Sequence, residues 1–546
     1  MRRAAGSARY PALLVLSVLG AACFLGAPAH AARAGSPWAA SPDPWARSTW
    51  GDAKADSAAK DVSGKNDPAK DPGSLYTVTT AIGARAVWSH TDASGRAITG
   101  QGVTVAVLDS GVAPVAGLNG AGKLIQGPDL SIETNSSTLQ GTDQFGHGTH
   151  LAGIIAAHDP TKTDAKTGAP LPTRTADQLG IAPGAKLLAL KLATRDGSTD
   201  VSEVIAALDW VSQHRGDNGM NVRVINLSFG TASLQPYQVD PLAAAAENAW
   251  HHGIVVVVSA GNDGAAAGRL TDPAIDPYVI AVGAADPNGK ASYNQAAVAA
   301  FSSVGTVARH VDLVAPGTSI AALRDPGSFV DVNFPSGRVA GDTTGRLFRG
   351  SGTSQAAAVV SGAAALLIQQ DPSLTPDQVK AILMGTADPI AGATAITAGA
   401  GQINLTKAYQ QVQLLRAGKL TPTQLAAMKQ RFPVASGLGS LEAARGGNDL
   451  VDARTGAVFS GEFDIQGTPW NAATWSKASA AGTAWSGAIW NGQIWTGPGW
   501  ANTARWVSSS WSSLRWSASR WSAAAWDASR WSASRWSASR WTGASW

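Results

Sequence analysis

The sequence predicts an α/β protein whose doubly wound, mostly parallel sheet is covered by helices on both faces. Short β-branched and apolar runs alternate with amphipathic or alanine-rich stretches such as Val201–Gln213 and Asp240–His252. This alternation is typical of parallel strands that are joined by crossover helices and buried on both faces. The predicted strands are Val103–Leu108, Leu187–Leu192, Val222–Leu227, Ile254–Ser259, Val279–Val282 and Leu313–Val314.

The composition allows a large apolar core and excludes disorder throughout the chain. The protein has 546 residues, of which 45% are hydrophobic and 15% charged. The formal net charge is +4, but from Trp470 onward seven basic residues stand against one acidic residue. The body is therefore nearly neutral, and any attraction to anionic surfaces belongs to the basic tail.

The first 31 residues are predicted to be an export signal. Three arginines precede the apolar run Ala12–Leu25, and Ala29-His30-Ala31 supplies the small residues that a signal peptidase requires. The alternative is an uncleaved membrane anchor, although the run is short for a bilayer. The one cysteine, Cys23, lies in this segment, so the mature protein would have neither a disulfide nor a thiol nucleophile. No transmembrane anchor is expected after signal removal, and residues 32–74 form a polar, low-complexity leader.

The C-terminal part divides into a linker and a repeat. A folded domain is predicted over 75–415, and a linker with a short helix over 416–465. In residues 466–546 tryptophan recurs every five residues, often within W-S-A-S-R units. Five residues advance a helix by about 500°, and an odd period alternates between the faces of a strand, so neither element explains the repeat. A β-solenoid with one repeat per side would explain it.

Three polar side chains stand where parallel sheets place functional groups. Asp109 follows the strand Val103–Leu108, His147 lies in G-H-G-T-H, and Ser354 lies in G-T-S-Q-A-A-A before an alanine-rich helix. Functional groups collect at the carboxyl ends of parallel strands, and a helix N-terminus favours negative charge on a serine oxygen or its oxyanion. Taken singly, Asp109 is a turn residue, Ser354 is a helix cap, and His147 with His150 is an incomplete metal site.

Two further strand ends carry candidate binding residues. Val222–Leu227 ends at Ser228-Phe229-Gly230, and Ile254–Ser259 ends at Ala260-Gly261-Asn262. The Asn262 amide can donate a hydrogen bond to a developing oxyanion without carrying a charge. The backbone of Ser228-Phe229-Gly230 can pair with an extended peptide as an added strand. Each segment alone is an ordinary turn.

Together these motifs resemble the subtilisin-like serine peptidases. The family's signatures occur in its order Asp, His, Ser as V-A-V-L-D-S-G, G-H-G-T-H-L-A-G and G-T-S-Q-A-A-A. L-G-I-A-P-G-A, V-I-N-L-S-F-G, V-S-A-G-N and V-A-P-G also match, so the resemblance covers roughly Tyr76–Tyr409. It implies a subtilisin-like fold over 75–415 and serine endopeptidase activity on protein or peptide substrates.

The resemblance also assigns roles to individual residues. Ser354 would attack the scissile carbonyl, His147 would take its proton, and Asp109 would orient the imidazole. Asn262 and the backbone N–H of Ser354 would hold the oxyanion. The substrate cleft would be lined by Ser228, Phe229, Gly230, Ala260 and Gly261. No cofactor is required; structural calcium is common in the family, but its ligands are not identified by this sequence.

The chain also departs from the family. Gln355, Ala358 and Val359 stand where methionine, proline and histidine are usual, which affects packing behind Ser354 but removes no catalytic group. The leader 32–74 is too short and polar to resemble the family's folded inhibitory propeptide. How the enzyme is kept latent therefore does not follow from the sequence.

Other functions remain open beside a secreted, extracellular peptidase. The same triad could transfer the acyl group to an amine, as in a peptide ligase, or an inactive fold could display the tail as a surface-binding module. The adjacent Trp and Arg residues of the tail favour cell-wall or glycan attachment, hence cell-wall association. A self-packed spacer is the alternative, and no specific nucleic-acid partner is expected.

Overall fold

The computed structural model describes residues 67–131, 133, 141–160, 164, 174–451 and 458–486, together with the backbone of 489–490, 493–494 and 534–535. The predicted export signal, most of the predicted leader and most of the Trp repeat lie outside these residues. Among the helices in these ranges, none combines the length and the apolar character that are needed to cross a membrane.

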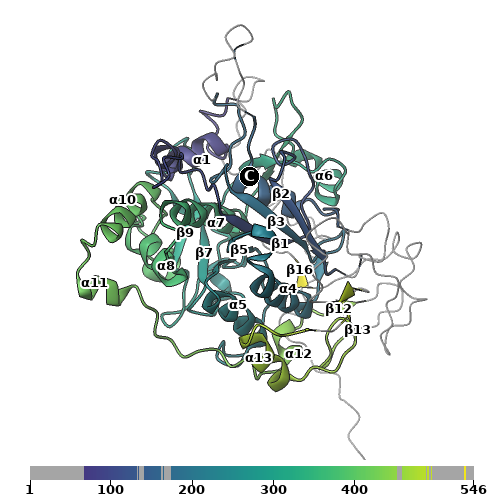
Figure 1. Cartoon of the computed structure of the whole chain (residues 1–546). Coiled ribbons are helices and arrows are strands. Elements are labelled where there is room, and N and C mark those ends of the chain that lie inside the picture. The colour runs from purple at the N-terminus through teal and green to yellow at the C-terminus, as the bar shows by residue number, and fades with distance from the viewer. Residues whose placement is uncertain are drawn as a thin grey trace, which may run out of the picture. The chain divides into compact units, whose positions relative to one another are not determined.

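The core of the described chain is a mostly parallel sheet. Its strands are β1 (Thr104–Asp109), β2 (Leu124–Asp129), β3 (Lys186–Lys191), β5 (Val222–Leu227), β6 (Val255–Ser259), β7 (Ile280–Asp286), β8 (Ala297–Val298) and β9 (Leu313–Pro316). Within the described residues it has eight strands in the order β2-β3-β1-β5-β6-β7-β8, with β9 also paired to β7 (Figure 1). Every pair is parallel except β7 with β8. The predicted α/β fold is confirmed.

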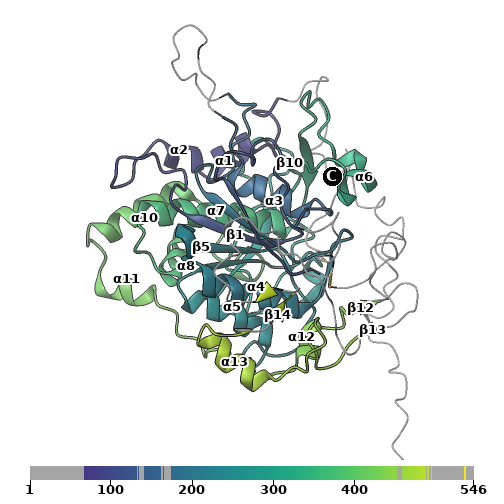
Figure 2. The same cartoon turned by 45° about the vertical axis from the view of Figure 1, so that its right-hand side comes forward.

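The larger helices cover both faces of this sheet. They are α3 (His147–Ala156), α4 (Val201–His214), α5 (Pro241–His251), α7 (Thr353–Gln370), α8 (Pro376–Gly385) and α10 (Leu405–Arg416). Figure 2 shows α3 and α7 above the sheet and α4 and α5 below it. Thr375 caps α8 through a capping box with Gln378, as its T-P-D-Q sequence indicates. This packing leaves the carboxyl ends of β1, β5 and β6 next to the N-termini of α3 and α7.

Shorter elements surround this core. The short helices are α1 (Leu75–Ala81), α2 (Ala84–Trp88), α6 (Phe329–Asn333), α9 (Ala395–Ala398), α11 (Pro422–Ala427), α12 (Leu441–Arg445), α13 (Ala472–Ala480), η4 (Asp217–Gly219), η5 (Ala265–Ala267) and η6 (Pro335–Gly337). The short strands are β4 (Ser198–Thr199), β10 (Ile320–Leu323), β11 (Leu347–Gly350), β12 (Leu450–Val451), β13 (Val458–Phe459), β14 (Ile489–Trp490), β15 (Gln493–Ile494) and β16 (Ser534–Arg535).

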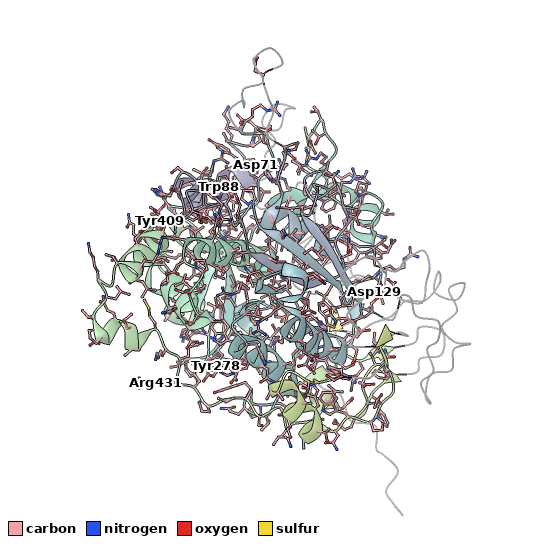
Figure 3. All side chains as sticks on the ribbon, in the orientation of Figure 1. Asp71, Trp88, Asp129, Tyr278, Tyr409 and Arg431 are labelled. Atoms are coloured by element: carbon pink, nitrogen blue, oxygen red, sulfur yellow. The ribbon has the colours of Figure 1, made fainter. Side chains whose placement is uncertain are left out.

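The end of the predicted leader packs against the β10–β11 hairpin. Asp71, labelled in Figure 3, forms an ion pair with Arg349 of β11 at 2.7 Å. Ser74 caps α1 and forms a β-bridge with Ala321 of β10. The hairpin leads through β11 directly into α7, so the chain before α1 lies against the segment that precedes Ser354.

The later part of the predicted linker, 416–465, packs on α4 and α5. The linker contains α11, as its T-P-T-Q cap indicates, and also α12 and the β12–β13 hairpin. Tyr278, labelled in Figure 3, donates a hydrogen bond from its hydroxyl to the backbone oxygen of Phe432 at 2.8 Å. Figures 1 and 2 show α12 beside α4 and α5, and the contacts between these elements agree.

The first tryptophans of the repeat pack on α4 and α5. The ring of Trp470 lies 5.0 Å from that of Trp475 and 6.2 Å from that of Trp485. The indole N–H groups of Trp475 and Trp485 donate to Asp209 Oδ2 of α4 at 2.8 and 2.9 Å. Burial raises the pKa of Asp209 to about 6. Trp475 lies in α13, whereas the predicted β-solenoid falls almost entirely outside the described residues.

Candidate active site

Asp109 and His147 form a buried pair at the carboxyl end of β1. Asp109 is the last residue of β1 and His147 the first of α3, and neither side chain is exposed. His147 Nδ1 lies 2.8 and 2.9 Å from the two carboxylate oxygens of Asp109. Because a carboxylate only accepts, this contact places a proton on Nδ1 and leaves Nε2 as the basic nitrogen of the neutral ring.

Glycine is required for α3 to approach β1 so closely. A Cβ atom on Gly148 would lie 2.0 Å from the backbone oxygen of Gly111 and 3.2 Å from Cβ of Asp109. The sequence G-H-G thus places the imidazole where a bulkier neighbour could not fit. Phe145 flanks the other side, with its ring centroid 6.4 Å from that of His147.

Ser354 lies in the first turn of α7, whose preceding residue Gly352 has an extended backbone. The serine side chain is fully buried, and its Oγ makes no hydrogen bond within the described residues. The alternative interpretation of Ser354 as a helix cap is not supported, because no side chain caps α7. A hydroxyl at this end of an 18-residue helix lies in the field that stabilises negative charge.

Asn262 is held in one orientation by the residue before Ser354. Its Oδ1 accepts hydrogen bonds from the Thr353 backbone N–H at 2.9 Å and from the Thr353 hydroxyl at 3.0 Å. Since both partners donate, the amide oxygen is fixed and Nδ2 is the donor end of the side chain. Thr353 was not among the residues predicted from the sequence, and its place directly before Ser354 in G-T-S was the available signal.

The five predicted substrate-binding residues lie on both sides of Ser354. Ser228 Oγ donates to the backbone oxygen of Ser354 at 3.4 Å, and the backbone N–H of Gly261 donates to Thr353 Oγ1 at 3.2 Å. Ser228, Phe229, Ala260 and Gly261 are buried, and Gly230 is half-buried. The ends of β5 and β6 therefore meet at the N-terminus of α7.

His147 and His150, considered together as an incomplete metal site, both lie on α3. His150 is buried on α3, and burial lowers its pKa to about 3, so it is neutral at physiological pH. Among the described residues, no three histidine, cysteine, aspartate or glutamate side chains are placed to hold a metal ion.

The chain is similar to serine proteases over the region that builds this site. The model of the subtilase family matches residues 100–419. Serine protease AprX of Bacillus subtilis (strain 168) is 36% identical over 336 residues, which are 60% of this chain and 70% of that protein. Subtilisin Savinase of Lederbergia lenta is 33% identical over 316 residues, 57% of this chain and 92% of that protein.

These similarities agree with the fold and with the residues gathered at the ends of β1, β5 and β6. The matched region includes the Asp109–His147 pair and the start of α7, and it spans more than half of the chain. The chain therefore belongs to the subtilase family, and it is a subtilisin-like serine endopeptidase.

Proposed function

We propose that the protein hydrolyses peptide bonds through an acyl-enzyme intermediate on Ser354. His147 Nε2 takes the proton of the Ser354 hydroxyl as Oγ attacks the scissile carbonyl carbon, and then gives that proton to the leaving amine. Asp109 keeps the imidazole in the required tautomer and stabilises the imidazolium. Water then attacks the acyl-enzyme by the same proton route and releases the second product.

The oxyanion of each tetrahedral intermediate would be held by two donors. These are Nδ2 of Asn262 and the backbone N–H of Ser354 at the start of α7. Thr353 fixes the Asn262 amide before substrate arrives, so little reorganisation is needed during the reaction. The buried Asp109–His147 contact of 2.8 Å is the observation that carries the proposal.

One experiment tests the proposal against a peptide ligase and an inactive fold. The purified full-length protein is incubated with an unfolded protein and with a serine-directed acylating probe. Cleavage and labelling are expected, and both should be lost in Ser354→Ala but kept in Ser373→Ala, an exposed serine beyond α7. Labelling of Ser354 without cleavage would support the ligase. Neither labelling nor cleavage by the unchanged protein would contradict the proposal.

We also propose that the peptidase acts outside the cell and that its basic Trp repeat binds cell wall or glycan. The export signal predicted for residues 1–31 and the side-by-side Trp and Arg residues support this location. Trp470, Trp475 and Trp485 pack on the peptidase domain, so they are not part of the proposed binding surface. The full chain should pellet with isolated cell walls, and a chain ending at Ser486 should stay in solution. Equal pelleting of the two would contradict attachment by the repeat.

A further inference from the structure

Asp143 lies behind the catalytic histidine and is almost entirely buried. Its carboxylate accepts hydrogen bonds from the Gly146 backbone N–H at 2.7 Å and the Thr149 backbone N–H at 2.8 Å. It also accepts from the Thr149 hydroxyl at 2.6 Å and the Ser110 hydroxyl at 2.9 Å. The carboxylate of Asp143 therefore holds the backbone on both sides of His147. In the proposed mechanism Asp143 does not contact the substrate.

Ser110 connects this carboxylate to that of Asp109. Its hydroxyl lies 3.2 Å from Asp109 Oδ1 and 2.9 Å from Asp143 Oδ1, while its oxygen accepts the Gly148 backbone N–H at 3.0 Å. A hydroxyl has one proton, so the two carboxylates share one donor. The hydrogen bond that Asp109 receives from Ser110 thus depends on the presence of Asp143.

We propose that Asp143 is a positioning residue for the reaction, holding the backbone around His147 and controlling the Ser110 hydrogen bond to Asp109. The inference rests on the proposed function of the triad and adds a residue to it. The available sequence signal was the aspartate four positions before His147 in D-Q-F-G-H-G-T-H. Its role depends on Ser110, 33 residues away, which no local pattern indicates.

Asp143 also sets the charge behind the imidazole. The charged or titratable groups around it come from several elements: Asp109 on β1, Lys191 on β3 and Asp325 after β10, while His150 on α3 interacts with His147. Burial raises the pKa of Asp143, and its two backbone N–H donors favour the ionised form. When Asp143 is ionised, its negative charge favours a protonated imidazole and so moves the onset of activity to higher pH.

Asp143→Asn tests the proposal in the full-length protein. The amide nitrogen of asparagine cannot accept a hydrogen bond, so at least one backbone N–H beside His147 loses its partner. Where the amide nitrogen faces Ser110, the Ser110 hydroxyl donates only to Asp109, which weakens the hold of Asp109 on the imidazolium. The stronger Ser110 hydrogen bond to Asp109 and the loss of charge each move the acidic limb of the pH–activity profile to lower pH, by roughly one unit together.

The rates are measured per active site, counted by labelling Ser354 with the acylating probe. We expect kcat to fall about 10- to 100-fold, because small displacements of a catalytic group are costly, while KM changes less than about threefold. Asp92→Asn is the matched control. Asp92 is also buried and accepts two backbone N–H groups, from Ser94 at 2.9 Å and Arg96 at 3.0 Å, but it lies in a turn away from the site. Its kcat and pH profile should equal those of the unchanged protein.

The outcomes separate a positioning role from a purely structural one. If Asp143→Asn lowers only the melting temperature or the fraction of labelled sites, with kcat per site and pH profile unchanged, the proposal is wrong. If this variant does not fold, Ser110→Ala replaces it. Ser110→Ala removes the hydroxyl that donates to Asp109, so the acidic limb of the pH–activity profile should move to higher pH. If the acidic limb stays where it is in the unchanged protein, the proposal is wrong. Failure of the triad mechanism itself would be seen already in the unchanged protein, as absence of labelling and cleavage.

Discussion

Arg445 is fully buried, and its Nε donates to Asp200 Oδ2 over 2.7 Å although the two residues are 245 positions apart. The same guanidinium donates to the backbone oxygens of Gly461 and Phe463 at 2.8 and 2.6 Å. Asp200 in turn caps α4. Because an unpaired charge is costly in the interior, these contacts hold α12 and the segment after it on the peptidase domain.

Arg445→Met should therefore destabilise the protein strongly. The substitution leaves Asp200 buried without its cation, which costs about 3–5 kcal/mol in comparable sites. Urea unfolding, followed by tryptophan fluorescence, measures the change in the free energy of unfolding. Arg416→Met, at an exposed position at the end of α10, is the matched control and should change stability by less than about 0.5 kcal/mol. A loss below 1 kcal/mol in Arg445→Met would mean that the pair does not stabilise the extension.

The sheet could be predicted from the sequence because its strands are buried on both faces. β1, β6 and β9 are buried along their whole length and therefore form continuous apolar runs. β2 was not predicted, because its Gly127-Pro128 step is typical of a turn. It lies at the edge of the sheet, where proline is tolerated.

The site was predictable only where its residues lie in local motifs. Asp109 and His147 meet as expected from the ends of their elements. The contact of Thr353 with Asn262 joins residues 91 positions apart, and that of Arg445 with Asp200 joins the end of α12 to the N-cap of α4, which share no local pattern. Such side-chain partners are set by the tertiary packing of segments, which periodicity and capping signals do not describe.

Asp276→Asn should make the protein more resistant to high pH. Burial raises the pKa of the Asp276 carboxyl to about 7, whereas an aspartate in the unfolded chain ionises near pH 4. Between about pH 4 and 7 the folded state binds more protons than the unfolded state. The free energy of unfolding of the protein therefore falls as the pH rises through this window. Above pH 7 the stability that the protonated Asp276 contributed is fully lost.

Asparagine removes this ionisation and can still accept the Tyr278 backbone N–H, now bonded at 2.8 Å. We expect equal stability of variant and unchanged protein near pH 4, and an advantage of up to about 4 kcal/mol for Asp276→Asn above pH 7. Urea unfolding at a series of pH values measures it. Asp67→Asn, at an exposed position, should show no such pH dependence. An advantage that is the same at all pH values would contradict the ionisation argument.

Asn262→Leu should reduce the rate of the chemical step. The substitution keeps the approximate size of the side chain but deletes the proposed oxyanion donor, a loss that costs on the order of 10²–10³ in kcat in subtilisin. KM should change little, because the donor acts on the transition state. Steady-state kinetics on a peptide substrate measure both constants. Thr353→Ser keeps the hydroxyl that holds Asn262 and should retain kcat within about tenfold. If Asn262→Leu raises KM by a larger factor than it lowers kcat, the oxyanion role is contradicted.

Gly146→Ala should displace His147. Gly146 precedes α3 with a φ of 100°, and an added Cβ would lie 2.4 Å from Ser328 Oγ. The variant therefore suffers both backbone strain, about 1–3 kcal/mol, and a steric contact with the segment that starts α6. We expect a lower melting temperature and a fall in kcat of at least about tenfold.

Gly95→Ala separates these two causes. Gly95 also has a positive φ, of 75°, but no atom lies within 4 Å of the added Cβ, so this variant measures backbone strain alone. It should lose stability and keep kcat. In Gly146→Ala/Ser328→Gly the steric contact is removed while the strain remains, so kcat should recover more than the melting temperature does. If kcat does not recover, the position of His147 depends on the backbone of Gly146 itself and not on the contact with α6.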